Sequence, residues 1–448
     1  MLKRIVLILA LLLPTFTLAQ DRPPNVIFIY ADDLGYGDVP FNGRKDWQTP
    51  NLDRLAREGT VFHRWYTASP VCTPSRGSLL TGKYTIHDAC THLGSKLPSH
   101  EVTIAEALKP RGYATALFGK WHLSVKEGKE GDPFDQGFDE FFGFMTGRQA
   151  WEKFPTQLVE GREMKPSKGY ADELFTNHAI DFVTRKKDQP FFLYLAYNTP
   201  HGPIEAPEED TAPFIGKFTE KDAAHPYNAM YAASITRQDK EIGRLLKTLD
   251  DLKLADNTLI IYTSDNGATF ETIAKSATAY HDSNRPLRGQ KRNLWEGGIR
   301  EPAVVRWPTH VPAGKESQEI IHMIDVFPTI CAATGAKVDP AWHVDGVNVL
   351  DALQAKANIP ERTLFWEWRY SGDTYFAAMR GNLKLVIVSN NKPELFDIER
   401  DPAERINVIV DNRPIATQLK KELDAWMATE TEETKKQLPT TNVANPAE

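Results

Sequence analysis

Short apolar runs alternate with helical patterns over the first three quarters of this 448-residue chain. Runs rich in β-branched and aromatic residues, bounded by polar or turn residues, predict buried strands. They lie at Val26–Tyr30, Thr115–Phe118, Phe191–Tyr197, Thr258–Thr263 and Pro302–Trp307. Because strands that alternate with helices form parallel sheets, this order predicts a large, mostly parallel or mixed α/β sheet sandwiched by helices.

Three of the intervening segments carry clear helix signals. From Thr49 to Gly59 the chain has a capping residue, a proline in the first turn and a closing glycine. Asn228–Leu252 repeats isoleucine and leucine at helical spacing. A third helix is predicted from Cys72 to Gly82, with Pro74 in its first turn.

After about Pro340 the pattern changes to short strands separated by Gly, Asn and Asp, followed by the helical segment Ile415–Trp426. These strands are Thr363–Trp368, Thr374–Met379, Leu383–Val388 and Glu394–Asp397. Such spacing is typical of an antiparallel meander. We therefore expect a catalytic domain over 20–340, a smaller antiparallel α+β subdomain over 341–430 and a polar tail over 431–448.

The first 19 residues have the pattern of a signal peptide. Lys3 and Arg4 precede the apolar run Ile5–Leu13, and Thr17–Ala19 ends in a small residue. The run is shorter than the roughly 20 residues that cross a bilayer, so no stable membrane insertion is expected. This pattern predicts an exported protein, secreted or periplasmic. The net charge of −7 argues against a nucleic-acid partner.

Polar side chains directly follow four of the predicted strands. In open α/β sheets, ligands bind outside the carboxyl ends of the strands. We therefore expect these side chains to line one crevice. They are Asp32 and Asp33 after the first strand, Lys120 and His122 after the second, His201 after the third, and Asp265 and Asn266 after the fourth.

The acidic and amide side chains of this set indicate a metal site. Asp32, Asp33, Asp265 and Asn266 offer hard oxygen donors, which suit Ca²⁺ or Mg²⁺ better than Zn²⁺. Asp-Asp and Ser-Asp-Asn-Gly are also common turn sequences. Their position after two apolar strands favours the metal interpretation.

Of the three cysteines, Cys72 has the most suggestive position. It lies at the N-terminus of a predicted helix, where backbone N–H groups favour an anionic ligand. The same place lowers a thiol pKa, so a thiolate nucleophile is one hypothesis and a buried, inert cysteine another. Cys90 and Cys331 either pair with each other or stay buried as thiols.

The sequence Cys72-Thr-Pro-Ser-Arg76, followed by Leu-Thr-Gly, resembles the modification motif of the sulfatase family. In that family a formylglycine-generating enzyme oxidises the cysteine to formylglycine (3-oxoalanine). The resemblance, especially to arylsulfatases and N-acetylgalactosamine sulfatases, covers nearly the whole chain after the signal peptide. It implies an alkaline-phosphatase-like fold. The other matching segments are Asn25–Gly37, Gly119–His122, Thr199–Pro203, Ser264–Gly267, Leu287–Lys291, Trp295–Pro302, Leu395–Asp397 and Asp401-Pro402.

The resemblance also implies roles in the hydrolysis of a sulfate ester, with a sulfated carbohydrate as the expected substrate. Ca²⁺ is held by Asp32, Asp33, Asp265, Asn266 and residue 72, whose hydrated aldehyde, a gem-diol, attacks sulfur. Arg76 stabilises the diol, Lys120 touches both diol and sulfate, and His122 removes the second diol proton. His201 and Lys291 grip the sulfate, and one of them protonates the leaving group. In this chain Gln290 stands before Lys291, where many relatives have glycine.

Location alone makes Arg148, His343 and Arg380, and with them Arg369, candidates for substrate binding. Two rival functions remain. One is a phosphonate or phosphate ester hydrolase of the same superfamily, and the other is an inactive protein that binds sulfated glycans. Comparing the turnover of an aryl sulfate with that of an aryl phosphate distinguishes a sulfatase from the phosphonate or phosphate ester hydrolase. The chemical state of Cys72 distinguishes a sulfatase from the inactive glycan-binding protein.

Overall fold

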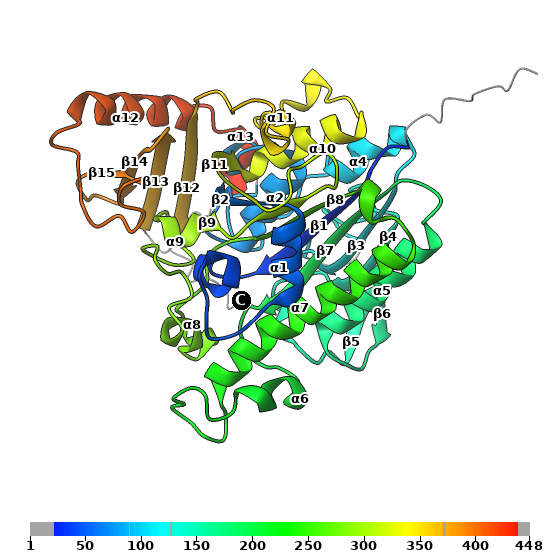
Figure 1. Ribbon diagram of the computed structural model, residues 1–448. Helices are drawn as coiled ribbons and strands as arrows, with labels where there is room; N and C mark the ends of the chain where they lie inside the picture. The colour runs from blue at the N-terminus through cyan, green and yellow to red at the C-terminus, as the bar shows by residue number, and fades with distance from the viewer. Residues whose placement is uncertain (1–21, 89, 126–127, 371–372, 438–448) are drawn as a thin grey trace, which may run out of the picture.

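The computed structural model describes residues 22–88, 90–125, 128–370 and 373–437, so the predicted signal peptide lies outside it. Its main feature is an 11-stranded mixed sheet that crosses the body of the molecule (Figure 1). The strand order is β11-β2-β10-β8-β1-β7-β3-β4-β5-β6, and β9 pairs with β2. The strands are β1 (Asn25–Asp32), β2 (Thr60–Tyr66), β3 (Ala114–Lys120), β4 (Glu140–Phe144), β5 (Gln157–Glu160), β6 (Glu163–Pro166), β7 (Phe191–Pro200), β8 (Thr258–Ser264), β9 (Arg300–Glu301), β10 (Val304–Arg306) and β11 (Lys315–His322).

The centre of this sheet is parallel. β1 lies between β7 and β8, with Phe28 opposite Tyr194 on one side and Ile261 on the other. All eight residues of β1 are buried, as expected for a strand covered on both faces. The five predicted strands are confirmed as β1, β3, β7, β8 and β10, although β10 runs antiparallel to its neighbours.

Helices cover both faces of the sheet (Figure 1). One face packs against α1 (Pro50–Glu58), α5 (Ala171–Arg185) and α7 (Tyr227–Asp251). The other packs against α2 (Cys72–Thr81), α4 (Ile104–Leu108) and α10 (Val326–Thr334). The predicted helices at α1, α2 and α7 are confirmed to within two residues at each end. Shorter helices are α3 (Thr85–Asp88), α6 (Glu208–Thr211), α8 (Ala277–Tyr280), α9 (Glu296–Ile299) and α11 (Leu350–Leu353).

A second sheet of four antiparallel strands follows, covered by one long helix. Buried Trp366 and Trp368 pack with Tyr66 and Ile299 of the main body, so the two sheets share an apolar interface. The strands are β12 (Thr363–Tyr370), β13 (Asp373–Arg380), β14 (Leu383–Val388) and β15 (Glu394–Asp397), and the helix is α12 (Arg413–Met427). All five elements were predicted from the sequence.

The segment predicted as a polar tail starts with a short polar helix, α13 (Glu432–Gln437). Thr434 is buried, and its hydroxyl donates a hydrogen bond of 2.9 Å to the carbonyl of Ile86. These contacts hold the start of the tail against the body, a docking that composition alone does not reveal. In the parts of the chain that the structure covers, no helix has the length and apolarity needed to cross a membrane.

Candidate active site

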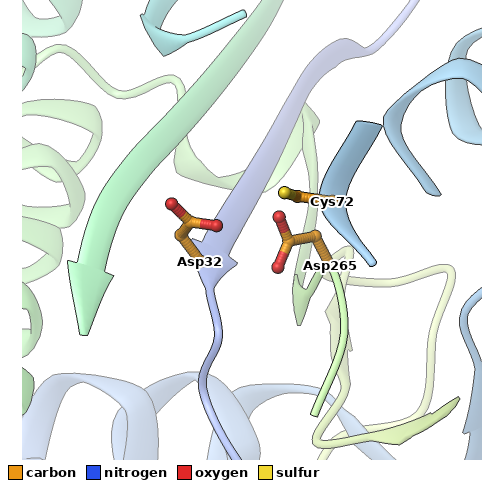
Figure 2. Close-up of side chains that lie close together, drawn as sticks. All are labelled: Asp32, Cys72 and Asp265. Carbon is orange, nitrogen blue, oxygen red and sulfur yellow. The ribbon is translucent and has the colours of Figure 1, made fainter. Parts of the chain in front are cut away.

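The polar residues that follow the central strands meet in one buried cluster. β1 ends at Asp32 and β3 at Lys120, while His201 and Asp265 come one residue after β7 and β8. Figure 2 shows the side chains of Asp32, Cys72 and Asp265 turned toward one another. We call the following ten buried residues the strand-end cluster: Asp32, Asp33, Cys72, Arg76, Lys120, His122, His201, Asp265, Asn266 and Lys291.

Two members of the cluster adopt a backbone conformation that side chains rarely take. Asp33 has φ 62° and His122 has φ 64°, so both lie in the left-handed region. Asp33 lies just beyond the end of β1, and His122 just beyond the end of β3. Strained residues of this kind gather at functional sites, where the surrounding structure fixes them.

Acidic and basic side chains alternate within the cluster. Lys120 Nζ lies 3.0 and 2.8 Å from the two carboxylate oxygens of Asp32. Arg76 Nη2 lies 2.7 Å from Asp265 Oδ2, and Lys291 Nζ lies 3.0 Å from Asp33 Oδ1. Each buried carboxylate therefore has a cationic partner.

Burial and neighbouring charges shift the pKa values of Asp32 and Asp265 in opposite directions. Burial opposes ionisation of Asp32, but Lys120 and the other nearby cations hold its pKa well below the usual value. Burial, and then the negative charge of Asp32, raise the pKa of Asp265 to about 7. Asp32 is therefore charged at neutral pH, and Asp265 titrates close to neutral pH.

The oxygen donors suit a bound cation. One ligand atom from each of Asp32, Cys72 and Asp265 lies within 4.8 Å of the others. The side-chain oxygen of Asn266 is buried and has no hydrogen-bond partner among the described residues, while its Nδ2 donates to Asp33 Oδ1 at 2.7 Å. A buried, unsatisfied oxygen beside carboxylates is the donor set that a hard cation prefers.

Cys72 opens helix α2, as predicted, and its side chain is buried. Burial raises the pKa of its thiol to about 11, even with Lys120 and Lys291 nearby. The thiol is therefore protonated at neutral pH, which argues against an ordinary thiolate nucleophile. Cys90 and Cys331 are buried free thiols and do not pair.

Two buried histidines flank this centre. Burial, followed by the charges of Lys120 and Arg76, holds the pKa of His122 well below its usual value. The neutral ring fits tightly against Gly147, where an added Cβ would lie 2.5 Å from its Nε2. His201 Nε2 lies 3.3 Å from Lys291 Nζ, and burial lowers the pKa of His201 as well.

The candidates for substrate binding lie in different places. Arg148 follows Gly147, which packs against His122, and the Arg148 guanidinium lies 4.1 Å from the centre of the Trp151 ring. His343 instead lines two surface pockets that include no member of the strand-end cluster. Arg380 pairs with Glu422 of α12, 2.6 Å away.

The structure also brings to the cluster two polar residues for which the sequence suggested no role. Lys153 is buried and donates a hydrogen bond of 2.6 Å to the carbonyl of Asn198, near the end of β7. Burial lowers the pKa of Lys153 to about 8, against the attraction of Asp32. Glu301 is buried, and burial, with Asp265 and Asp33 nearby, raises its pKa well above the usual value. Lys153 lies in no motif, and Glu301 lies in the family-like segment Trp295–Pro302 but was given no role there.

The fold and this site together define a hydrolase of anionic esters, in which oxygen ligands, lysines and histidines surround a cysteine at a helix N-terminus. The chain belongs to the sulfatase family, and it is a sulfuric ester hydrolase. Residues 24–336 match the family described as Sulfatase, and residues 289–431 match N-sulphoglucosamine sulphohydrolase, C-terminal.

Individual proteins agree with this assignment. The chain is 33% identical to human N-acetylgalactosamine-6-sulfatase over 400 residues, covering 81% of this chain and 71% of the relative. The crystal structure of Ps i-CgsB in complex with k-i-k-neocarrahexaose superposes with a TM-score of 0.84 at 32% identity, covering 92% of this chain and 94% of that one. The phosphonate monoester hydrolase of Agrobacterium radiobacter, at 21% identity and a TM-score of 0.67 over 91% of this chain and 96% of its own, shares the fold.

Proposed function

We propose that this enzyme removes sulfate from a sulfated carbohydrate, using formylglycine made from Cys72 and a bound Ca²⁺. The reaction converts the sulfate ester and water into an alcohol and hydrogen sulfate. One observation carries the proposal: Cys72 lies in a buried centre that contains both oxygen ligands and the cations Arg76, Lys120 and Lys291. A sulfate ester spreads negative charge over its oxygens, and fixed cations stabilise that charge best in a site from which water is excluded.

The state of residue 72 supports the modified form. A protonated, buried thiol is a poor nucleophile, whereas the hydrate of an aldehyde at this position supplies an oxygen nucleophile. Because Cys72 is only 1% exposed in the folded protein, the formylglycine-generating enzyme must reach it before folding is complete. Maturation by that enzyme is therefore part of the proposal.

The oxygen donors of Asp32, Asp33, Asp265 and Asn266 would hold the ion. Four oxygen ligands from the protein itself favour Ca²⁺ over Mg²⁺, which usually keeps several waters. The ion would supply Lewis acidity toward the sulfate oxygens.

The remaining cluster residues fit distinct steps. Neutral His122 can accept a proton from the hydroxyl of residue 72, since its Nδ1 is buried without a hydrogen-bond partner among the described residues. Lys120 and Arg76 stabilise negative charge around that oxygen. His201 and Lys291, 3.3 Å apart, form the pair from which the leaving oxygen takes its proton.

A carbohydrate substrate is supported by the relatives and by the rim of the site. One relative is named for N-acetylgalactosamine 6-sulfate, and Ps i-CgsB was crystallised with k-i-k-neocarrahexaose. Arg148 and Trp151 form a cation-on-indole surface in the loop whose Gly147 packs against His122, and such a surface suits the apolar face and anionic groups of a sulfated sugar. The leader pattern of residues 1–19 supports action outside the cytoplasm, where sulfated polysaccharides occur.

The test is to express the chain with a formylglycine-generating enzyme, confirm the aldehyde by mass spectrometry of the tryptic peptide Trp65–Arg76, and assay desulfation of defined sulfated saccharides. We expect calcium-dependent release of sulfate, with Cys72→Ala as the inactive control. An unmodified thiol together with saccharide binding would identify a glycan-binding protein. Faster turnover of aryl phosphate than of aryl sulfate would identify a phosphate ester hydrolase.

A further inference from the structure

Helix α9 is a single short turn that lies between the main body and the second sheet (Figure 1). Two glycines in it make very close backbone contacts. Gly297 N donates a hydrogen bond of 2.7 Å to the carbonyl of Arg288, and a Cβ at Gly297 would lie 2.7 Å from that oxygen. A Cβ at Gly298 would lie 2.6 Å from the carbonyl of Gln290. The loop that carries Lys291 is therefore packed directly on α9.

The same turn touches the chain next to a proposed calcium ligand. Gly267, the neighbour of Asn266, donates its N–H to the carbonyl of Gly298 at 3.3 Å. An added Cβ at Gly267 would lie 1.9 Å from the carbonyl of Gly297. Any shift of α9 would therefore move the surroundings of both Lys291 and Asn266.

The position of α9 is fixed by a buried charged group on its first residue, Glu296. One carboxylate oxygen of Glu296 lies 2.8 Å from Lys384 Nζ, and the other accepts a hydrogen bond of 2.8 Å from the hydroxyl of Tyr66. Arg300 Nη1 lies 3.3 Å from that second oxygen. Lys384 comes from β14, so this ion pair joins the second sheet to α9.

Lys384 also connects to Glu404, which holds α9 from another direction. Lys384 Nζ lies 3.1 Å from Glu404 Oε1, and Glu404 Oε2 accepts a hydrogen bond of 2.6 Å from the backbone N–H of Glu296. The carbonyl of Glu404 accepts a hydrogen bond of 3.0 Å from Arg288 Nη1. The side chains of Glu296, Lys384 and Glu404 are fully buried. Without Lys384, two buried carboxylates would face each other at the start of α9.

We propose that Lys384 is a positioning residue for the active site: by bridging Glu296 and Glu404 it fixes α9, and through α9 the loop of Lys291 and the backbone beside Asn266. The antiparallel sheet is then part of the machinery that orders the catalytic centre. The expected effect of Lys384 on calcium affinity rests on the proposed calcium site, whereas its expected effect on sulfate ester turnover does not.

The experiment compares the mature enzyme with Lys384→Met, which keeps the length of the side chain and removes its charge. Since residues that orient metal ligands typically contribute 10- to 100-fold, we expect kcat for an aryl sulfate to fall by about 10- to 100-fold and the calcium Kd to rise by a similar factor. Glu404→Gln added to Lys384→Met removes one of the two opposed carboxylates, so the double variant should recover part of both losses.

Arg64→Met is the matched control. Arg64 of β2 is buried and donates to Asn382 Oδ1 at 2.6 Å and to the carbonyl of Gly381 at 3.0 Å, so it also joins the second sheet to the main body. It makes no hydrogen bond or ion pair with α9 among the described contacts. This variant should lose thermal stability but keep kcat and the calcium Kd.

Equal losses in Arg64→Met and Lys384→Met would overturn the proposal, because they would show a general effect of loosened docking. A folded Lys384→Met enzyme with unchanged kcat and Kd would also overturn it. If Lys384→Met does not fold, Glu404→Gln alone carries the test, and the same two constants must change. Wild-type enzyme that lacks turnover or calcium binding would instead contradict the proposed function.

Discussion

In the proposed calcium site, Lys120 and the ion would compete for the carboxylate of Asp32, which leads to an unusual expectation for Lys120→Met. The ammonium group lies within 3.0 Å of both oxygens of Asp32 and is almost completely buried. In the variant, the cationic neighbour left to Asp32 in the described contacts is Arg76, at 3.6 Å. We expect Lys120→Met to bind calcium more tightly than the wild type while it loses activity.

The magnitude follows from the distances around Asp32. An ion about 2.4 Å from either carboxylate oxygen lies no more than about 5.4 Å from Lys120 Nζ, because Nζ lies 3.0 and 2.8 Å from those oxygens. With an effective dielectric constant of about 20, the repulsion between a single and a double charge at that distance is about 6 kcal/mol. Relaxation and the neighbouring acids screen most of this energy. Recovery of only a quarter still lowers the calcium Kd by about tenfold, since 1.4 kcal/mol corresponds to a factor of ten.

Calorimetric titration of calcium into the metal-free proteins measures this effect, and aryl sulfate turnover measures the accompanying loss of kcat. Lys153→Met is the matched control, because Lys153 is also buried near Asp32 but donates to backbone carbonyls. Its calcium Kd should change much less. A weaker calcium affinity in Lys120→Met would refute the reasoning, because it would show that Lys120 orders Asp32 for the ion instead of competing with it.

Three further outcomes are expected. Chelation of calcium should lower the unfolding temperature, because an ion at 100 times its Kd stabilises the folded state by about 2.7 kcal/mol. Magnesium should not restore the unfolding temperature, and equal recovery with magnesium would contradict the calcium assignment. His122→Gln should lower kcat by about 10²- to 10⁴-fold in a turnover assay while the calcium Kd stays the same, and an unchanged kcat would exclude His122 as the proton acceptor. Burial raises the pKa of Glu367 to about 7, so the folded state holds a proton that the unfolded state releases, and stability falls as pH rises from about 4.5 through 7. At pH 8, Glu367→Gln should therefore be more stable than the wild type, by at most about 3 kcal/mol. Urea unfolding of both proteins at pH 5 and pH 8 measures this difference, and a variant with the same pH dependence as the wild type would contradict the prediction.

The elements of the fold follow closely from the sequence because their local signals are strong. β14 and β15 have the predicted bounds, and α7 differs by one residue at each end. β1 was predicted as five apolar residues and extends to Asp32, because its last residues pair with β7 and β8 and stay buried. Continuous apolar runs and helical spacing are local patterns, so they predict the type and approximate bounds of an element from a short stretch of the chain.

The gathering of the strand-end cluster could be predicted for a topological reason. Seven of its ten members lie at or just beyond the ends of neighbouring parallel strands, and parallel strands end at the same edge of a sheet; Cys72 and Arg76 come from α2 instead, and Lys291 comes from a loop. That rule does not apply to the second sheet, because its strands are antiparallel. The orientation of the second sheet relative to the main sheet depends on packing. Arg380 was accordingly proposed for substrate binding from its location alone, and in the structure it pairs with Glu422 of α12. The contact between Lys384 and Glu296 joins residues far apart in the chain and has no local signature.

The charge balance of the cluster explains how an acidic protein can favour an anionic reaction. Asp32, Asp33 and Asp265 oppose Arg76, Lys120 and Lys291, so these six groups cancel when all are ionised. Ca²⁺ would add two positive charges that no cluster residue neutralises. A sulfate ester brings one negative charge, and as the bond to sulfur breaks this charge shifts toward the leaving oxygen while the total stays the same. If His201 and Lys291 donate to the leaving oxygen, the cluster stabilises this shifted charge more than the charge of the bound ester, and such differential stabilisation is what accelerates a reaction.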